Sequence, residues 1–433
     1  MRVLLLTPYI SIPGDKRFTR KITDFGLNVF ELAKNIVTKG GEVSLLMNQF
    51  TPGGMVDGVE IIGCSTQAAA RHSNEQLTQG ILQMIMNSQM KKHRIFNVYL
   101  SLLCEGYIEK SIHHLRPDVI HVHSLSLTGF ALLAAALSSG LPTVISIHSL
   151  TDYVDSSSFE ARFEQGAIET LNELGFTVSV DSDGMHSYIL RKSRIMHPDK
   201  LLVIPPGIHY VPMGNPSLKT ALRNIHRLPQ NRFIIADIGS PHAVKQRSAL
   251  LEGFLQLDAD LQRNAHLLIP AEGWERARLS TLIRLNRAQE NISLYSPTGH
   301  SHLTDIYSLA DLAVYYGDNF DSGIPIIRSW GVGLPVLASA DQETVTSLYH
   351  PQCMELLFDT TPQAFAEGLN RAVTRPWDNR AIHNHARAFS WDKVILQYQQ
   401  LYGRANSVML KPEELLARIF MKMPPAKNAA KIV

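Results

Sequence analysis

Short runs of consecutive apolar residues recur along the chain and alternate with longer segments whose apolar residues return every three or four positions. Continuous apolar runs are typical of strands in a parallel sheet that is covered on both faces. Their alternation with helical periodicity favours parallel β-α-β units. In the first half of the chain, the expected strands are 2–7, 42–47, 116–124, 141–150, 176–182 and 200–207.

A second series of the same kind follows a segment that is rich in proline and glycine. Its expected strands are 233–239, 266–271, 291–296, 312–315 and the apolar run after Pro335. Between the two series, proline and glycine favour a hinge at Pro205, Pro206, Pro212, Gly214 and Pro216. A chain of 433 residues is also too long for one ordinary domain. We therefore predict two α/β domains that meet near residues 207–216.

Helical periodicity predicts the elements that connect these strands. The first helix is expected over 27–40, with Gly40 as its C-terminal stop, because glycine readily ends a helix. Further helical segments are expected at 66–116, 130–138, 303–310, 389–402 and 413–423.

Composition indicates a globular protein with no strong charge preference. The formal net charge is +2, so a nucleic-acid partner is not expected. The three cysteines are scattered, which suits a reducing compartment. The apolar run at the N-terminus is too short for a signal peptide, so we expect a cytoplasmic protein. No His, Cys, Asp or Glu cluster has metal-ligand spacing along the chain, so no metal is expected.

The stretch 311–342 carries the strongest candidate site. A buried strand breaks into a polar loop and then enters a helix, and open α/β sheets hold anionic ligands at such joints. Helix N-terminal amides favour negative charge, and glycine lets the backbone approach a phosphate. The loop offers Gly317, Gly323 and the amides around Ile324. The alternative interpretation is a plain turn, in which the glycines serve only the backbone.

Three histidines lie on or just after two predicted strands of the first half. His121 and His123 share one strand face, and the simplest interpretation is that both are packed core residues. His148 ends its strand and begins a polar loop, so we expect it at the site edge of the sheet.

The segment FDSGIPIIRSWGVGLPVLA (320–338) resembles the nucleotide-sugar loop of GT4-type glycosyltransferases with the GT-B fold. That family typically has E-G-F-G-L-P-x-L-E-A-M-A-x-G-x-P-V-[IV]-A. The glycines, the prolines and the final P-V and A fall in register, whereas Phe320 and Arg328 replace both glutamates. A shifted acidic group, Asp318 or Asp321, is the expected substitute, and Arg328 is expected to bind phosphate or an acidic sugar.

Other segments extend the resemblance over nearly the whole chain. Residues 233–246 are similar to the family's diphosphate segment, F-x-x-[VG]-G-R-L-x-x-x-K-G, and keep Gly239 and Lys245. Ser240 replaces the arginine with which that lysine neutralises the leaving diphosphate in the family. Residues 389–402, FSWDKVILQYQQLY, are similar to the family's closing helix. The resemblance places His148 beside the sugar, and it assigns the remaining binding positions to Gly14, Gly26, Gly323, Ile324 and Glu343.

The resemblance implies an α/β fold with two Rossmann-like domains facing across a cleft. The expected parts are an acceptor domain (1–210), a nucleotide-sugar domain (211–388), a helix crossing back to the first domain (389–405) and a tail (406–433). The last residues of that tail are expected to be loosely held, with peripheral contact at the inner face of the membrane as an alternative.

The implied function is transfer of a sugar from a nucleotide-sugar donor, UDP-sugar above all, to a hydroxyl of a glycan, lipid-linked or protein acceptor. The resemblance also implies that the transferred sugar retains its anomeric configuration. It implies as well that transfer needs no cofactor or metal. The replaced charges at 240, 320 and 328 leave a second hypothesis open. In it, the chain has lost donor binding and serves as a partner or scaffold for another glycosyltransferase. Phosphorylase or epimerase chemistry on the same fold is a third hypothesis.

Overall fold

The structure is a computed structural model of the chain. It describes residues 1–15, 17–18, 23–73, 75–86, 92–150, 157–209, 216–240, 243–296, 300–317 and 323–425.

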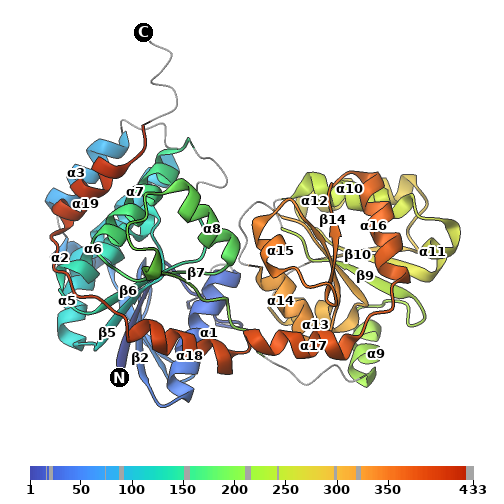
Figure 1. Cartoon of the computed structure of the whole chain (residues 1–433), viewed down its shortest axis with the longest axis horizontal. Helices are drawn as coiled ribbons and strands as arrows, with labels where there is room; N and C mark the ends of the chain where they lie inside the picture. The colour runs from blue at the N-terminus through green and yellow to red at the C-terminus, as the bar shows by residue number, and fades with distance from the viewer. Residues whose placement is uncertain are drawn as a thin grey trace, which may run out of the picture. The chain divides into compact units, whose positions relative to one another are not determined.

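The chain divides into two compact units (Figure 1). Unit 1 comprises residues 1–207 and 394–433, and unit 2 comprises residues 208–393. The elements of unit 1 are β1 (Arg2–Thr7), α1 (Asp24–Thr38), β2 (Glu42–Phe50), β3 (Gly54–Val56), β4 (Val59–Cys64), α2 (Thr66–His72), α3 (Glu75–Met86), α4 (Lys92–Leu103), α5 (Glu105–Leu115), β5 (Val119–Val122), α6 (Phe130–Ser138), β6 (Thr143–Ile147), α7 (Phe159–Glu173), β7 (Val178–Val180), α8 (Asp183–Lys192), β8 (Leu201–Val203) and α19 (Pro412–Lys422).

Unit 2 repeats the alternation of strands and helices. Its elements are α9 (Pro216–Ile225), β9 (Phe233–Asp237), α10 (Val244–Leu255), α11 (Ala259–Asn264), β10 (Ala265–Pro270), α12 (Gly273–Leu285), β11 (Ile292–Tyr295), α13 (His300–Leu309), β12 (Leu312–Tyr315), α14 (Ile324–Gly331), β13 (Val336–Ser339), α15 (Glu343–Leu348), β14 (Met354–Leu357), α16 (Pro362–Thr374) and α17 (Asn379–Ala386). Helix α18 (Trp391–Tyr402) begins in unit 2 and ends in unit 1.

The sheet of unit 1 has eight strands in the order β3-β4-β2-β1-β5-β6-β7-β8. All neighbouring strands are parallel except β3 and β4, which form an antiparallel hairpin. The strand order changes direction between β1 and β5, and ligands of open α/β sheets bind at such a switch point. Every residue of β5, β6 and β7 is buried, as expected for a sheet with helices on both faces.

The first helix starts earlier than its apolar pattern predicts. It begins at Asp24 rather than residue 27, because the Thr23 side chain accepts a hydrogen bond from the Gly26 amide at 3.1 Å. A threonine in this position satisfies an amide that the helix itself leaves without a partner. The helix start is therefore marked by Thr23 in the sequence TDFG, about one turn before the first apolar residue of the helical pattern.

Helix α19 lies within residues 406–433, where the apolar pattern predicts a helix at 413–423. Leu415, Leu416 and Ile419 are buried, and the helix packs against α7 in unit 1 (Figure 1). Asn406 forms a bridge with Thr143, at the start of β6. The buried face of α19 therefore belongs to the unit 1 core, because it covers apolar surface on α6 and α7.

The sheet of unit 2 has six parallel strands in the order β11-β10-β9-β12-β13-β14. Its strand order changes direction between β9 and β12. The loops after these two strands therefore lie next to each other at the carboxyl edge of the sheet. Apolar side chains fill both faces, with Trp330 of α14 completely buried on one of them and Phe254 of α10 on the other.

Across the described part of the chain, no helix is both long enough and apolar enough to cross a membrane.

The contact of α7 with α19 gives a test of this packing. A Cβ at Gly166 of α7 would lie 2.5 Å from the Ile419 carbonyl oxygen, whereas a Cβ at Gly80 of α3 meets nothing within 4 Å. Gly166→Ala is expected to lower the free energy of unfolding by about 1–3 kcal/mol, because backbone must move. Gly80→Ala, the matched control, is expected to raise it by about 0.5–1 kcal/mol, through the lower entropy of the unfolded chain. Urea unfolding measures both, and equal effects would contradict the packing of α19.

Candidate functional site

Three loops of unit 2 converge at the switch point of its sheet. Gly317, in the loop after β12, is so close to its neighbours that a Cβ there would lie 3.4 Å from both Ser240 Cβ and Gln342 Nε2. Gln342 caps the start of α15, and its side-chain amide donates to the Gly317 carbonyl at 2.7 Å. The carboxyl ends of β9, β12 and β13 thus meet at one place, which is where open α/β sheets bind ligands.

The N-terminus of α14 also opens at this edge. Gly323 precedes the helix with φ 70°, and a Cβ there would lie 2.5 Å from Leu348 Cδ1, so position 323 requires glycine. No side chain among the described residues caps α14, and Pro325 lacks an amide hydrogen. The first amides of a helix have no partner inside it, so Ile324 presents its N–H as an anion-binding group.

Two charged residues predicted for the site lie in the first turns of neighbouring helices. Lys245 is the second residue of α10 and is exposed, and Glu343 is the first residue of α15 and half-buried. Arg328 is half-buried one turn into α14, whose other residues are buried. The structure therefore places Lys245, Arg328 and Glu343 on α10, α14 and α15, the helices that follow the strands β9, β12 and β13.

The loop after β9 is packed tightly at Gly239. Its amide donates to Asp237 Oδ1 at 2.9 Å, and the Ser240 amide donates to the Tyr316 carbonyl at 2.8 Å. A Cβ at Gly239 would lie 2.6 Å from the Tyr316 ring. These two amides are thus used to fold the loop, and close contact with Tyr316 requires glycine at position 239.

A buried ionic cluster holds this loop in place. Arg247 of α10 donates to Asp237 Oδ2 at 3.0 Å, to Glu275 Oε1 at 3.0 Å and to the Ser240 carbonyl at 2.9 Å. The Tyr316 hydroxyl donates to Asp237 at 2.5 Å. Burial raises the pKa of Asp237, against the opposing attraction of Arg247. The sequence analysis missed this cluster, although an aspartate at the end of an apolar strand (FIIAD) was a visible signal.

In unit 1, His148 belongs to a buried row of polar side chains at the carboxyl edge of the sheet. Its Nδ1 lies 2.9 Å and 3.1 Å from the two carboxylate oxygens of Asp181, and its Nε2 lies 3.0 Å from His123 Nδ1. Nδ1 of His148 donates to the Asp181 carboxylate, and its Nε2 shares a hydrogen bond with Nδ1 of His123. The His148 side chain is only 6% exposed. Asp181 was not predicted, but it ends the strand that pairs with β6.

His121 and His123 are core residues, as the simplest interpretation predicted. Both are completely buried, with ring centroids 3.8 Å apart. His121 lies 2.7 Å from Ser146 Oγ and 3.2 Å from the Tyr402 hydroxyl of α18. Burial lowers the pKa of both histidines well below the usual value, and the neighbouring histidines add to the effect.

Of the remaining predicted residues, Gly14 lies in an exposed turn, Gly26 is closely packed, and the two aspartates are not described by the structure. Gly14 has φ 81° in an open turn, whereas a Cβ at Gly26 would lie 2.5 Å from Ser11 Oγ, so Gly26 lets α1 approach the loop after β1. Asp318 and Asp321 lie outside the described residues, as does Phe320.

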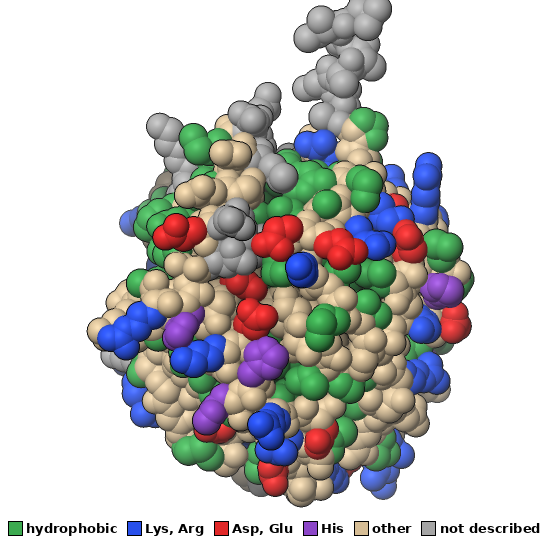
Figure 2. Space-filling view, turned by 90° about the vertical axis from the view of Figure 1, so that its left-hand side faces the viewer, with side chains coloured by type: hydrophobic (Ala, Val, Ile, Leu, Met, Phe, Trp, Pro, Cys, Tyr) green, Lys and Arg blue, Asp and Glu red, His purple; other side chains and the backbone are tan. Residues whose placement is uncertain are grey.

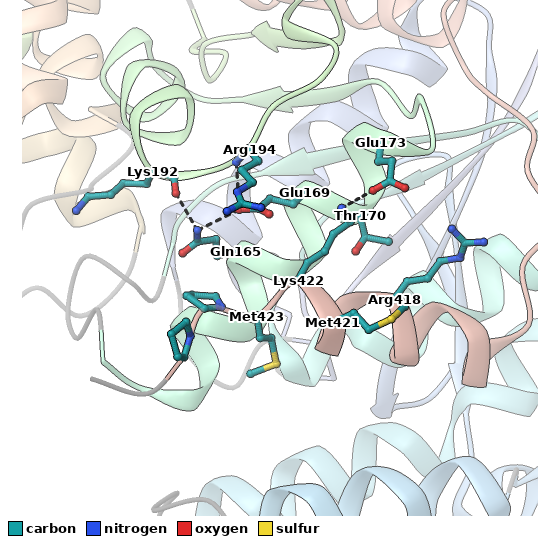
Figure 3. A pocket seen from close by; sticks show the side chains of 12 residues that line it. Gln165, Glu169, Thr170, Glu173, Lys192, Arg194, Arg418, Met421, Lys422 and Met423 are labelled. Atoms are coloured by element: carbon teal, nitrogen blue, oxygen red, sulfur yellow. Dashed lines mark hydrogen bonds and ion pairs between the residues drawn. The ribbon is translucent and has the colours of Figure 1, made fainter. Parts of the chain in front are cut away.

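A cavity of about 580 Å³ in unit 1 lies apart from these residues (Figure 3). It is lined by α7, α8 and α19 side chains that include Glu169, Glu173, Lys192 and Lys422. Lys422 pairs with Glu173, and the Arg194 amide donates to Glu169. Its charges are thus partly paired with one another, and none of its lining residues was predicted for the site.

Two family models match the chain and together span most of it. Glycosyltransferase Family 4 matches residues 29–210, and Glycosyl transferases group 1 matches residues 219–389. The chain is a GT4-type glycosyltransferase. It has the GT-B fold, which confirms the resemblance on which the expected fold and activity rested.

Curated relatives of this glycosyltransferase are distant. D-inositol 3-phosphate glycosyltransferase of Actinosynnema mirum is 23% identical over 312 residues, which cover 67% of this chain and 73% of the relative. Alpha-monoglucosyldiacylglycerol synthase of Acholeplasma laidlawii is 22% identical over 255 residues, covering 56% of this chain and 63% of that enzyme.

Solved structures show the same fold at low identity. Sucrose-phosphate synthase from Thermosynechococcus elongatus superposes with a TM-score of 0.69 at 18% identity, covering 93% of this chain and 99% of that one. Anabaena HepE in complex with UDP-glucose has a TM-score of 0.64 at 13% identity, again covering 93% and 99%.

The buried histidines of the glycosyltransferase predict a pH-dependent stability. Because their folded pKa values are lowered, the unfolded chain binds more protons, and stability falls as pH drops below about 6.5. His123→Gln is expected to reduce this slope by up to about 1.4 kcal/mol per pH unit, measured by urea unfolding from pH 7.5 to 5. Ser146→Ala, the control, removes a partner of His121 and no titrating ring, so it should lower stability without changing the slope. A slope that His123→Gln leaves unchanged would contradict the prediction.

Proposed function

We propose that this glycosyltransferase moves a sugar from a UDP-sugar donor to a hydroxyl acceptor, with unit 2 binding the donor. The observation that carries the proposal is the convergence at the unit 2 switch point. There, Ser240, Gly317 and Gln342 come together beside the N-terminus of α14. This arrangement suits an anionic ligand, and a nucleotide diphosphate is the anionic part of the family's donors.

The choice of UDP is supported by the solved relatives. HepE has been crystallised with UDP-glucose and with UDP and glucose, whereas a starch synthase from Arabidopsis thaliana binds ADP. In this proposal the donor is a substrate, and neither a cofactor nor a metal takes part in transfer.

Lys245 and the α14 N-terminus are proposed to stabilise the departing diphosphate. Negative charge grows on the leaving oxygen as the glycosidic bond breaks, so fixed positive groups lower the barrier. Arg247 cannot supply that charge, because it already donates to Asp237 and Glu275. With serine at position 240, Lys245 becomes the principal cation for the phosphates, and Arg328 supports it from α14.

The acceptor is proposed to bind unit 1, near the loop that contains Gly14 and Gly26. His148 is proposed to line the sugar site, with its ring oriented by Asp181 at one nitrogen and by His123 at the other. The transferred sugar is proposed to retain its anomeric configuration. Asp318 or Asp321 is proposed to supply the acidic group that the family's glutamates provide elsewhere. Glu343 is proposed to contact the donor from the first turn of α15.

The chemistry of the acceptor is proposed from the relatives' names. One of them is named for an inositol phosphate and another for a diacylglycerol lipid, so a hydroxyl on a polar lipid or glycan fits best. A lipid-linked acceptor would bring a cytoplasmic enzyme to the inner face of the membrane. On the face of unit 1 in Figure 2, acidic and basic side chains are interspersed, so such contact would rest on the acceptor rather than on charge.

Lys245→Ala is expected to weaken UDP-glucose binding by about 1.5–3 kcal/mol, the range for a hydrogen bond to a charged group. Isothermal titration calorimetry of the full chain measures the change in Kd. The control is Lys411→Ala, which removes an exposed lysine at the start of α19 in unit 1. An unchanged Kd for Lys245→Ala would remove this lysine from the donor site.

The acidic group is tested by Asp318→Asn and Asp321→Asn. At least one of them is expected to lower kcat/KM by about 100-fold or more, because a carboxylate in contact with the reacting sugar is lost. The double change Phe320→Glu with Arg328→Glu, which restores the family's glutamates, should then not raise activity. If instead the wild type neither binds nor turns over any nucleotide sugar at millimolar concentration, the chain is a partner subunit for another glycosyltransferase.

A further inference from the structure

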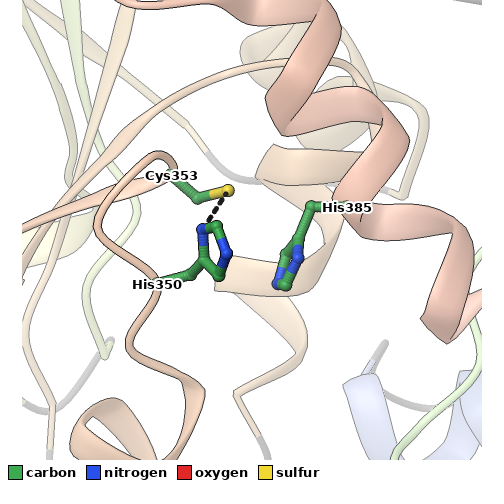
Figure 4. Close-up of side chains that lie close together, drawn as sticks. All are labelled: His350, Cys353 and His385. Carbon is green, nitrogen blue, oxygen red and sulfur yellow. Dashed lines mark hydrogen bonds between the residues drawn. The ribbon is translucent and has the colours of Figure 1, made fainter.

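Two histidines and a cysteine gather in unit 2, apart from the loops described above. His350 and Cys353 lie in the turn before β14, and His385 lies on α17 (Figure 4). Each side chain offers one ligand atom, and these three atoms all lie within 4.8 Å of one another. Among the described residues, this is the group of histidine, cysteine and carboxylate side chains that meets the spacing of a metal site.

The distances suit tetrahedral coordination. Cys353 Sγ lies 3.6 Å from His350 Nδ1. In a tetrahedral zinc site, bonds of about 2.3 Å to sulfur and about 2.0 Å to nitrogen set the sulfur–nitrogen separation at about 3.5 Å. These two ligands therefore already have the required separation. The His385 ring stands beside the His350 ring, with centroids 4.3 Å apart and planes at 31°, so a small rotation completes the third ligand.

The local backbone explains why the first two ligands face the same way. The amides of Cys353 and Met354 both donate to the His350 carbonyl, at 2.9 Å and 3.0 Å. These hydrogen bonds close a tight turn over His350-Pro351-Gln352-Cys353. In such a turn, the first and fourth side chains project to the same side, as two ligands of one metal ion must.

The third ligand is positioned by the docking of α17. Asn379 donates to the Gly333 carbonyl at 2.9 Å, and His383 Nδ1 lies 3.0 Å from the Gly331 carbonyl oxygen. The His385 ring then packs edge-on against Trp330 of α14, with centroids 5.1 Å apart. An apolar wall thus limits the movement of His385, and a shell of this kind controls the access of solvent to a metal.

Solvent reaches part of the cluster. Cys353 is completely buried, whereas both histidines are half-buried and so partly accessible to an ion. Three protein ligands leave one tetrahedral position for water or another small ligand. Thiolate together with imidazole favours zinc over magnesium or calcium, which prefer oxygen.

We propose that His350, Cys353 and His385 form a binding site for a zinc ion that joins α17 to the entrance of β14. The ion would link α17 to the turn before β14, and so hold His385 in place beside Trp330 of α14. The expectation of no metal considered spacing along the chain, whereas His385 reaches this site through the fold. The site is separate from sugar transfer, so its occupation does not depend on the function proposed above.

The experiment uses the full chain, treated with chelator and then titrated with Co²⁺ as the spectroscopic substitute for Zn²⁺. Nucleotide is absent, so no donor can chelate the ion. One equivalent of Co²⁺ is expected to produce a sulfur-to-metal charge-transfer band together with the strong visible absorption of tetrahedral Co²⁺. Zn²⁺ should displace it and remove both signals.

The variants assign the ligands. Cys353→Ser should abolish the charge-transfer band, and His350→Ala and His385→Ala should each weaken Zn²⁺ binding by about 100-fold. Because Cys353 is buried, the two histidine variants keep the test valid if the serine variant fails to fold. Cys64→Ser with Cys104→Ser is the matched control, since these sulfurs also lie close together, 3.8 Å apart, in unit 1.

The outcomes separate the alternatives. Retention of the band in the Cys64/Cys104 control, and its loss in Cys353→Ser, supports the site. Absence of stoichiometric binding to the wild type would overturn it. Binding that survives both His350→Ala and His385→Ala would also overturn it, because the metal would then sit elsewhere. If Lys245→Ala loses donor binding but still binds Co²⁺, the metal site is independent of the donor site, and this outcome supports the metal proposal.

Discussion

The buried ion pair between Asp237 and Arg247 holds the start of the loop that follows β9. Asp237 ends β9 and accepts from the Gly239 amide, from Arg247 and from Tyr316, while Arg247 holds the Ser240 carbonyl. Hydrogen bonds therefore hold the loop both at Asp237 and at Ser240. Loss of one partner from a buried pair leaves an uncompensated charge, which costs about 3–5 kcal/mol. The position of Ser240 beside Gly317 depends on this cluster.

The same cluster limits how the charge of a diphosphate can be balanced. Where the family has arginine, this chain has Ser240, and the nearby Arg247 is committed to two carboxylates. In the proposed function, the positive charge for the phosphates therefore comes from exposed Lys245, half-buried Arg328 and the N-terminus of α14.

Unit 1 satisfies its buried polar groups through strand pairing. Paired strands place polar side chains in register, so that Ser146 lies beside Ser179 and His148 beside Asp181. Each buried group obtains a partner from the next strand, which satisfies most of the hydrogen-bonding capacity of the row. His123 Nε2 is the exception within this row: it is buried without a described partner. Helix α18 completes the row by bringing the Tyr402 hydroxyl to His121.

The sequence by itself indicated most of the strands along the chain, the two α/β domains and the family. Apolar runs and helical periodicity are local, and motif spacing survives even where single residues change, as at Phe320 and Arg328. Local signals also explain the missed β3–β4 hairpin, whose turn at Asp57-Gly58 has positive φ at both residues, as Asp-Gly turns commonly do.

Only the tertiary structure decided which side chains meet. Asp181 reaches His148 through strand pairing, Arg247 reaches Glu275 across two helices, and His385 reaches Cys353 through the docking of α17. It also showed that Gly239 packs closely against Tyr316, with its amide bonded to Asp237. Partners far apart in the chain are selected by packing and by the need to satisfy buried polar groups, and neither leaves a periodic signal in the sequence.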